Sequence, residues 1–168
     1  MADKPSSPIF ERLALIGIGL IGSSIARVAK RENLAGHISA SARTQDSLDK
    51  AIELGFADSV SLDQKAAVKD ADMVIICAPV GAYEEIIKAI APALKPGAIV
   101  SDVGSVKQAV VRDLGPHIPE GVHLIPAHPV AGTEHSGPEA GFPELFEDRW
   151  CILTPPPGTD EKSVEAVK

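Results

Sequence analysis

The stretch Leu13-Ala-Leu-Ile-Gly-Ile-Gly-Leu-Ile-Gly-Ser23 decides the fold that this chain is expected to adopt. It is an apolar run, typical of a buried β-strand, that enters the motif G-x-G-x-x-G and is followed at once by an amphipathic, helix-like run. Gly17 permits a tight strand-to-helix turn, Gly19 lets the backbone approach a pyrophosphate, and Gly22 lets the helix pack close to the strand. The motif therefore predicts a dinucleotide-binding turn.

The start of the predicted helix gives a second reason to expect a phosphate at this turn. The backbone N–H groups of Leu20 and Ile21 have no partner inside the helix, and the helix dipole favours negative charge beside them. A second strand-like run about 20 residues further on completes the βαβ unit in which this motif binds cofactors. The alternative is a glycine-rich turn in an α/β protein that holds no dinucleotide.

Strand-like and helix-like runs alternate along the rest of the chain. This alternation predicts an α/β fold of the Rossmann type, a doubly wound, mainly parallel sheet with helices on both faces. The expected strands are residues 12–16, 37–42, 73–78, 98–102, 122–127 and 150–154, and the expected helices are residues 20–33, 44–54, 83–94 and 105–114. Ligands gather at the carboxyl ends of the strands in such sheets, so the loops at 17–22, 42–44, 78–81, 102–107 and 128–137 are the candidate site.

The pattern divides the chain into three parts. Residues 1–10 lack an apolar signal core and are expected to be a disordered tail, and residues 11–158 are expected to form the dinucleotide-binding domain. Residues 159–168, capped by Thr159 or Asp160, are expected to begin a linker helix. Because a helix of this length is marginal on its own, we expect the chain to be the front part of a longer protein.

Composition excludes several classes of function. The 168 residues are 45% hydrophobic, enough for a core, and carry a net charge of −7 and few aromatic residues, which argues against a nucleic-acid partner. No run reaches transmembrane length, so we expect no membrane partner. Cys77 and Cys151 are far apart and nothing has metal-ligand spacing, so we expect two free thiols, no metal and a cytoplasmic protein.

The end of the second strand bears on which nicotinamide cofactor binds. It reads Ser39-Ala-Ser-Ala-Arg-Thr44 and has no carboxylate to bind the ribose 2′-hydroxyl of NAD. Ser41, Arg43 and Thr44 instead offer a cation and two hydroxyls, which suit the 2′-phosphate of NADP. We therefore expect NADP or NAD to bind, with NADP slightly favoured; the alternative is that Arg43 is a solvated loop residue.

Two further blocks carry a family resemblance. They are Ser101-Asp-Val-Gly-Ser-Val-Lys107 and Gly121-Val-His-Leu-Ile-Pro-Ala-His-Pro-Val-Ala-Gly-Thr-Glu-His-Ser-Gly137. Together with the glycine motif, they make residues 10–158 similar to the prephenate/arogenate (cyclohexadienyl) dehydrogenases of tyrosine biosynthesis. The resemblance implies oxidative decarboxylation of prephenate and/or arogenate by hydride transfer to NAD(P). It also implies a helical C-terminal domain, absent from this chain, that dimerises the full-length protein and completes the active site.

The resemblance also implies roles for residues in these blocks. His128 is expected to accept the substrate hydroxyl proton, because histidine exchanges a proton near neutral pH and this one follows a predicted strand at the ligand edge. The Ser105 hydroxyl is expected to bond the substrate or His128, and Ser105 is also a plausible helix cap. Thr133 and Glu134 are expected to line the substrate pocket, with a surface carboxylate as the alternative for Glu134. His135 occupies the variable position of its block and is expected to be exposed.

Further residues are expected on the cofactor side of the site. Lys107 could hold anionic groups or be a solvated lysine, and Asp102 could orient its neighbours or end its strand. The loop after the central strand is expected to contact the cofactor through Ala78, Pro79 and Val80.

Two other functions remain open on the sequence. One is another NAD(P)-dependent enzyme of this architecture, acting on a β-hydroxy acid or an imine, and the other is a non-catalytic NAD(P)-sensing module. The segment from His128 to Glu134 argues against the first, and a histidine and a serine near the nicotinamide end argue against the second.

Overall fold

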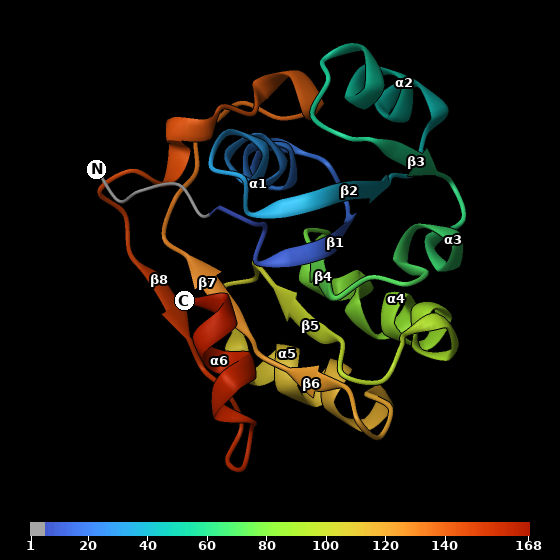
Figure 1. The fold of residues 1–168 in the computed structure, drawn as a ribbon, viewed down its shortest axis with the longest axis vertical. Helices are drawn as coiled ribbons and strands as arrows, with labels where there is room; N and C mark the ends of the chain where they lie inside the picture. The colour runs from blue at the N-terminus through green and yellow to red at the C-terminus, as the bar shows by residue number, and fades with distance from the viewer. Residues whose placement is uncertain (1–5) are drawn as a thin grey trace.

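A computed structural model describes residues 6–168, so the first five residues of the expected tail lie outside the described residues. Six parallel strands form the main sheet (Figure 1). Their spatial order is β3 (Ser59–Ser61), β2 (Ala35–Ser41), β1 (Phe10–Ile16), β4 (Met73–Ile76), β5 (Ile99–Asp102) and β6 (His123–Leu124). The order 3-2-1-4-5-6 is that of the Rossmann fold, and the predicted doubly wound sheet is confirmed.

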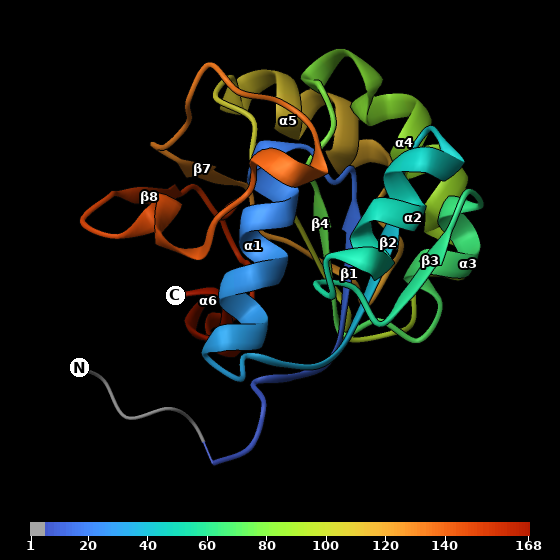
Figure 2. The same cartoon turned by 90° about the horizontal axis from the view of Figure 1, so that it is seen from above.

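Each face of the sheet has its own hydrophobic core because alternate residues of each strand point to opposite sides. Leu13 and Leu15 of β1 belong to one core, and Ala14 and Ile16 belong to the other. The first core is covered by α1 (Leu20–Arg31), α2 (Gln45–Glu53) and α6 (Glu161–Val167). The second is covered by α3 (Gln64–Val68), α4 (Tyr83–Ile90) and α5 (Lys107–Leu114), and Figure 2 shows α1 and α3 on opposite sides of β1.

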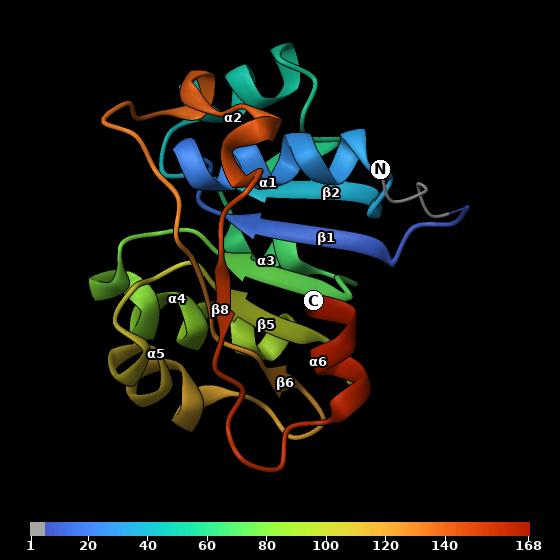
Figure 3. The ribbon, with the colours of Figure 1, turned by 90° about the vertical axis from the view of Figure 1, so that its left-hand side faces the viewer.

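The C-terminal helix α6 is packed on the sheet. The Asp160 carboxylate caps it by accepting a hydrogen bond from the Ser163 N–H at 2.8 Å, one of the two caps expected from the sequence. Val164, Ala166 and Val167 pack against the core on the α1 side, where Figure 3 shows α6 beside β5 and β6. Residues 161–167 therefore contribute to the packing of this domain.

The chain leaves the main sheet after β6 and forms a separate small sheet of β7 and β8. The single strand expected at 122–127 is divided into β6 and β7 (Ala127–Pro129), and β7 pairs antiparallel with β8 (Cys151–Leu153). Pro126 lies at the division and has no N–H to donate to a neighbouring strand, so the main sheet ends there. Its carbonyl instead accepts a hydrogen bond from the Thr154 N–H at 2.9 Å, at the end of the small sheet.

Some boundaries differ from those expected. β1 begins at Phe10, whose N–H donates to the Leu34 carbonyl, so the expected tail ends before this residue. The helix expected to reach residue 33 ends at Arg31, because Asn33 adopts a left-handed conformation with φ 56°. The helix expected at 83–94 ends at Ile90 and continues as a short 3-10 turn, Ala91–Ala93, that contains Pro92. The short elements β3 and α3 were not expected.

No helix within residues 6–168 has the length and apolar character needed to cross a membrane.

Candidate functional site

The three glycines of the turn between β1 and α1 have different surroundings. Gly17 has φ +97°, and a Cβ there would lie 2.9 Å from the Cys77 carbonyl oxygen. A Cβ on Gly22 would lie only 2.2 Å from the Gly17 carbonyl oxygen, so the close packing of α1 on the turn requires glycine. A Cβ on Gly19 would meet nothing within 4 Å. The fold thus explains two of these glycines, and the open space at Gly19 fits an external group that approaches the backbone.

The start of α1 fits a phosphate. Gly19 is its N-cap residue and forms no side-chain cap, so Leu20 and Ile21 open the helix without a competing side chain. The Ser23 hydroxyl donates to the Gly19 carbonyl at 2.7 Å and thereby ties the turn to the first helical turn. The residues present therefore fit the pyrophosphate of a dinucleotide.

The end of β2 places one free cation beside this turn. Ser41 is buried, and its carbonyl accepts a hydrogen bond from the Gly17 N–H at 2.8 Å. The Thr44 hydroxyl caps α2, accepting from the Ser47 N–H at 3.3 Å and donating to the Ser47 hydroxyl at 2.9 Å. Arg43 is exposed, and its side chain forms no ion pair with any described residue. Of the three residues expected to face a 2′-phosphate, Arg43 has the side chain that is free to do so.

The loop after β4 lies against the loop after β5. Ala78 and Val80 are half-buried and Pro79 is exposed. A Cβ on Gly104 would lie 2.8 Å from a Val80 methyl group, so the two loops touch at this point. These loops form adjoining parts of the same carboxyl edge.

Asp102 ends β5 and is hydrogen-bonded through both carboxylate oxygens. Oδ1 accepts from Lys107 Nζ at 2.7 Å and from the Ala127 N–H at 3.1 Å, and Oδ2 accepts from Lys107 Nζ at 2.6 Å and from the Gly104 N–H at 2.8 Å. The Asp102 residue is 1% exposed and the Lys107 side chain 17%. The alternative that Lys107 is a solvated lysine is therefore wrong: its ammonium group lies in a shielded ion pair, because the buried carboxylate requires a counter-charge.

Tyr83, the first residue of α4, lies beside the Asp102–Lys107 ion pair. Its hydroxyl lies 3.3 Å from both Asp102 Oδ2 and the Ile76 carbonyl. Burial and the neighbouring Asp102 charge raise the pKa of Tyr83 above its ordinary range, and burial likewise raises the pKa of the Cys77 thiol. Neither group ionises at neutral pH, so Asp102 and Lys107 supply the charges of the cluster.

The two expected catalytic residues flank this cluster. Ser105 is exposed in the loop that connects Asp102 to Lys107, and His128 is half-exposed in β7, opposite Ile152 of β8. The expectation that Ser105 caps the following helix is wrong, because α5 begins at Lys107 with Val106 at its N-cap and no side-chain cap. The Ser105 hydroxyl is therefore not used by the helix.

The loop after β7 carries the other expected substrate residues. Thr133 lines an open pocket of about 440 Å³ between this loop and residues 142–149, and its hydroxyl accepts from the His135 N–H at 3.2 Å. The Glu134 side chain is 84% exposed and the His135 side chain 72%, so both face solvent. The alternative of a surface carboxylate thus describes Glu134 in this structure, and His135 is exposed as expected.

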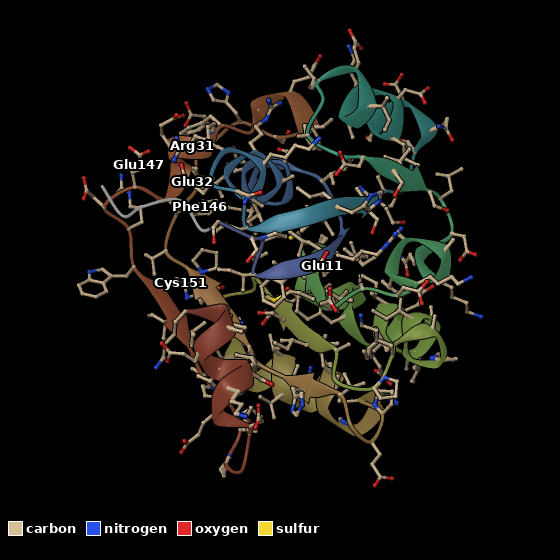
Figure 4. All side chains as sticks on the ribbon, in the orientation of Figure 1. Glu11, Arg31, Glu32, Phe146, Glu147 and Cys151 are labelled. Atoms are coloured by element: carbon tan, nitrogen blue, oxygen red, sulfur yellow. The ribbon has the colours of Figure 1, made fainter. Side chains whose placement is uncertain are left out.

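Residues 138–147, which we call the return segment, run from this loop back over α1. A Cβ on Gly141 would lie 2.1 Å from Ser23 Oγ, and the Phe142 N–H donates to Ser24 Oγ at 3.1 Å. At the far end of α1, Arg31 pairs with Glu144 at 2.8 Å and Glu147 at 3.1 Å, and Figure 4 shows Arg31 beside Glu147. This connection between α1 and the loop after β7 was not predicted from the sequence, in which Gly141 is the residue that could have indicated it.

Comparison with known families gives a consistent result. The family described as prephenate dehydrogenase, nucleotide-binding domain, matches residues 25–168. The cyclohexadienyl dehydrogenase of Zymomonas mobilis is 42% identical over 156 residues, covering 93% of this chain and 53% of that protein. The prephenate dehydrogenase of Bacillus subtilis is 33% identical over 159 residues, covering 94% of this chain and 43% of that protein.

A solved structure shares the fold at similar coverage. Prephenate dehydrogenase from Aquifex aeolicus, in complex with hydroxyphenyl propionate and NAD⁺, superposes with a TM-score of 0.85 at 32% identity. The match covers 94% of this chain and 55% of that one. The chain thus spans about half the length of the relatives that it matches.

Proposed function

This chain belongs to the prephenate dehydrogenase family, and from that premise we propose that it is the cofactor-binding half of an enzyme of tyrosine biosynthesis. The proposed reaction is the oxidative decarboxylation of prephenate and/or arogenate with reduction of NAD(P). The observation that carries the proposal is the open backbone at Gly19, on the same carboxyl edge as the free Ser105 hydroxyl and the half-exposed His128. A ligand-free α/β protein would have no use for this arrangement.

His128 has the central chemical role in this proposal. Its imidazole accepts the proton of the substrate hydroxyl while a hydride leaves the ring carbon that bears this hydroxyl. The Ser105 hydroxyl orients the imidazole or the substrate hydroxyl. When bound, the nicotinamide ring of the cofactor supplies the hydride acceptor.

The proton balance needs no second acid. The carbon–carbon bond between the ring and the carboxylate breaks, and carbon dioxide leaves. The electron pair of this bond stays with the ring, makes it aromatic and places a negative charge on the ring oxygen. His128 returns its proton to that oxygen. The products are a phenol, carbon dioxide and reduced cofactor.

We also propose that NADP binds at least as well as NAD. The support is the absence of a carboxylate at the end of β2 and the free Arg43 side chain there, because a guanidinium suits the 2′-phosphate. The hydroxyls of Ser41 and Thr44 contribute less in this proposal, since Ser41 is buried and Thr44 caps α2.

The test is a turnover assay of the full-length protein with prephenate and with arogenate, each with NAD⁺ and NADP⁺. Formation of reduced cofactor together with the phenolic product is the expected result. His128→Asn should lower kcat by a factor of at least about 100, because general-base catalysis is removed, while the Kd of the cofactor stays the same.

His135→Asn is the matched control, since this exposed histidine belongs to the same sequence block. It should leave kcat within about twofold of the parent enzyme. Near-normal turnover in His128→Asn would remove His128 from its role. Oxidation of a β-hydroxy acid or reduction of an imine, without activity on either cyclohexadienyl substrate, would assign a different reaction to this architecture. Because this chain spans about half of its relatives, we expect residues 1–168 alone to bind cofactor with negligible turnover.

A further inference from the structure

We propose that the Asp102–Lys107 ion pair is a positioning device that fixes His128 and Ser105 relative to one another, an inference that rests on the proposed function. Neither residue of the pair is given a direct contact with substrate or cofactor. They act through the backbone of the two segments that carry the proposed catalytic groups.

The pair holds both polar backbone groups of Ala127, the residue that precedes His128. The Ala127 N–H donates to Asp102 Oδ1 at 3.1 Å, and the Ala127 carbonyl accepts from Lys107 Nζ at 2.5 Å. The Ala127 N–H belongs to the peptide that precedes this residue and its carbonyl to the peptide that joins it to His128, so both peptide planes that flank Ala127 are held. The direction in which the His128 side chain leaves β7 is therefore set by Asp102 and Lys107.

The same pair closes the loop that contains Ser105. Asp102 and Lys107 stand at the two ends of this loop and are joined at 2.6 Å, and the Gly104 N–H donates to Asp102 Oδ2 at 2.8 Å. A Cβ at Gly104 would lie 3.1 Å from Asp102 Oδ2 and 3.1 Å from the Tyr83 hydroxyl, so the loop is closely packed against the carboxylate. One ion pair thus positions both segments.

The hydrogen bonds of the Lys107 ammonium group favour a positioning role over the binding of an anion. The ammonium group of Lys107 is directed to both Asp102 oxygens and to the Ala127 carbonyl, which uses its three donors. The cofactor role expected for these two residues would require these contacts to break, at the cost of leaving the buried Asp102 carboxylate unpaired.

A matched pair occupies the opposite edge of the sheet. Asp72, just before β4, accepts the Arg12 N–H at 2.8 Å and pairs with Lys95 at 2.5 Å. Like Asp102, Asp72 combines a backbone N–H with a lysine, although Asp102 accepts two backbone N–H groups and is more deeply buried. This pair fixes the start of β1, away from the proposed catalytic residues, and serves as the control.

The test compares neutral double variants in the full-length protein. Lys107→Met alone leaves a buried carboxylate unpaired and should lower Tm, whereas Asp102→Asn with Lys107→Met removes both charges and should recover most of the loss. A merely structural pair would recover kcat together with Tm. A positioning pair leaves kcat at least about tenfold below the parent enzyme while Tm and the Kd of the cofactor recover. The control, Asp72→Asn with Lys95→Met, should keep kcat within about twofold.

A second measurement does not depend on activity. Amide hydrogen exchange at Ala127 and His128 should speed up in the Asp102→Asn/Lys107→Met variant and in the milder Asp102→Asn variant, but not in the control. Full recovery of kcat, or unchanged exchange at Ala127, would overturn the positioning role. If the parent enzyme turns over no cyclohexadienyl substrate, the proposed function fails, while the exchange data still decide whether the pair positions His128.

Discussion

The amino and carboxyl ends of the parallel sheet differ in how their polar groups are used. At the amino end, an aspartate just before a strand takes an N–H of the strand alongside: Asp72 accepts from Arg12, and Asp58 accepts from Ile38 at 2.8 Å and pairs with Lys30 at 2.7 Å. At the carboxyl end, the backbone at Gly19 faces open space, and the exposed Ser105 hydroxyl is not used to cap α5. Because the fold uses neither feature, both are available to the cofactor and substrate that we propose at this end.

The two ends of the sheet therefore differ in what their residues contribute, stability at the amino end and the proposed binding at the carboxyl end. Asp102 and Lys107 lie at the carboxyl end but bind each other and the Ala127 backbone. In the proposed role, these contacts hold Ser105 and His128 in position for substrate. Changes at the amino end should lower stability with little effect on binding. Changes at the carboxyl end should affect binding with little effect on stability, except where a glycine is packed inside the fold or where the buried Asp102 carboxylate loses its lysine.

The largest effect on the fold is expected from Gly22→Ala. The added methyl group would lie 2.2 Å from the Gly17 carbonyl, and the forced displacement of α1 should cost about 3 kcal/mol and abolish cofactor binding. Gly19→Ala adds the same methyl group in open space, so it should keep Tm within a few degrees. Thermal unfolding and calorimetric titration of both variants check this contrast.

Equal losses of Tm in the two glycine variants would contradict the contrast. Gly19→Ala should still weaken cofactor binding, because its methyl group occupies the space assigned to the pyrophosphate. Unchanged cofactor affinity in this variant would move the binding site away from the turn.

A smaller effect is expected at the return segment. Gly141→Ala places a methyl group 2.9 Å from the Ser24 amide nitrogen and closer still to the Ser23 hydroxyl, so the segment must lift from α1 at a cost of about 1–2 kcal/mol. Since the segment follows the loop of Thr133, we expect faster hydrogen exchange across residues 138–147 and a raised KM for the substrate. If amide hydrogen exchange across residues 138–147 is as slow in Gly141→Ala as in the parent protein, other contacts hold the return segment.

The smallest effect is expected at the amino end, in acid. Burial acts to raise the pKa of Asp72, but the hydrogen bonds from Lys95 and Arg12 outweigh it and lower this pKa. A lowered pKa in the folded state contributes stability above the unfolded value of about 3.9, and this contribution is lost as the pH falls through the folded value.

Lys95→Met should therefore cost about 1 kcal/mol at neutral pH, and this cost should disappear as the pH falls through the lowered pKa of Asp72 in the folded state. Urea unfolding across this range is the measurement. A penalty that persists unchanged in strong acid would assign the effect to lost packing of the lysine chain.

The sequence predicts the parts of this molecule that are built from local pattern. The strands β1 and β4 and the glycine turn follow from apolar runs and from the spacing of Gly17, Gly19 and Gly22. The strands β2 and β5 follow from the alternation of strand-like and helix-like runs. The short elements β3 and α3 escape prediction, because three to five residues carry too little periodicity. The general position of the site follows directly from the fold, since the loops after the strands share one edge.

The details of the site depend on contacts between residues far apart in the chain. The ion pair of Lys107 depends on the burial of Asp102, which one sequence pattern does not reveal, and the division of the strand at Pro126 depends on pairing with β8. The position of the return segment on α1 depends on Ser23 and Ser24 meeting Gly141 across more than a hundred residues. Long-range packing, rather than local propensity, decides these features.

We infer that the carboxyl end of this sheet binds a nicotinamide dinucleotide at the glycine turn. The first measurement is a calorimetric titration of this chain with NADP⁺ and with NAD⁺ in parallel, repeated with Gly19→Ala and with Arg43→Ala. We predict binding of both, tighter for NADP⁺, weakened for both by Gly19→Ala, with the preference for NADP⁺ removed by Arg43→Ala. Binding of NAD⁺ alone would refute the role of Arg43, and binding of neither dinucleotide would contradict the claim itself.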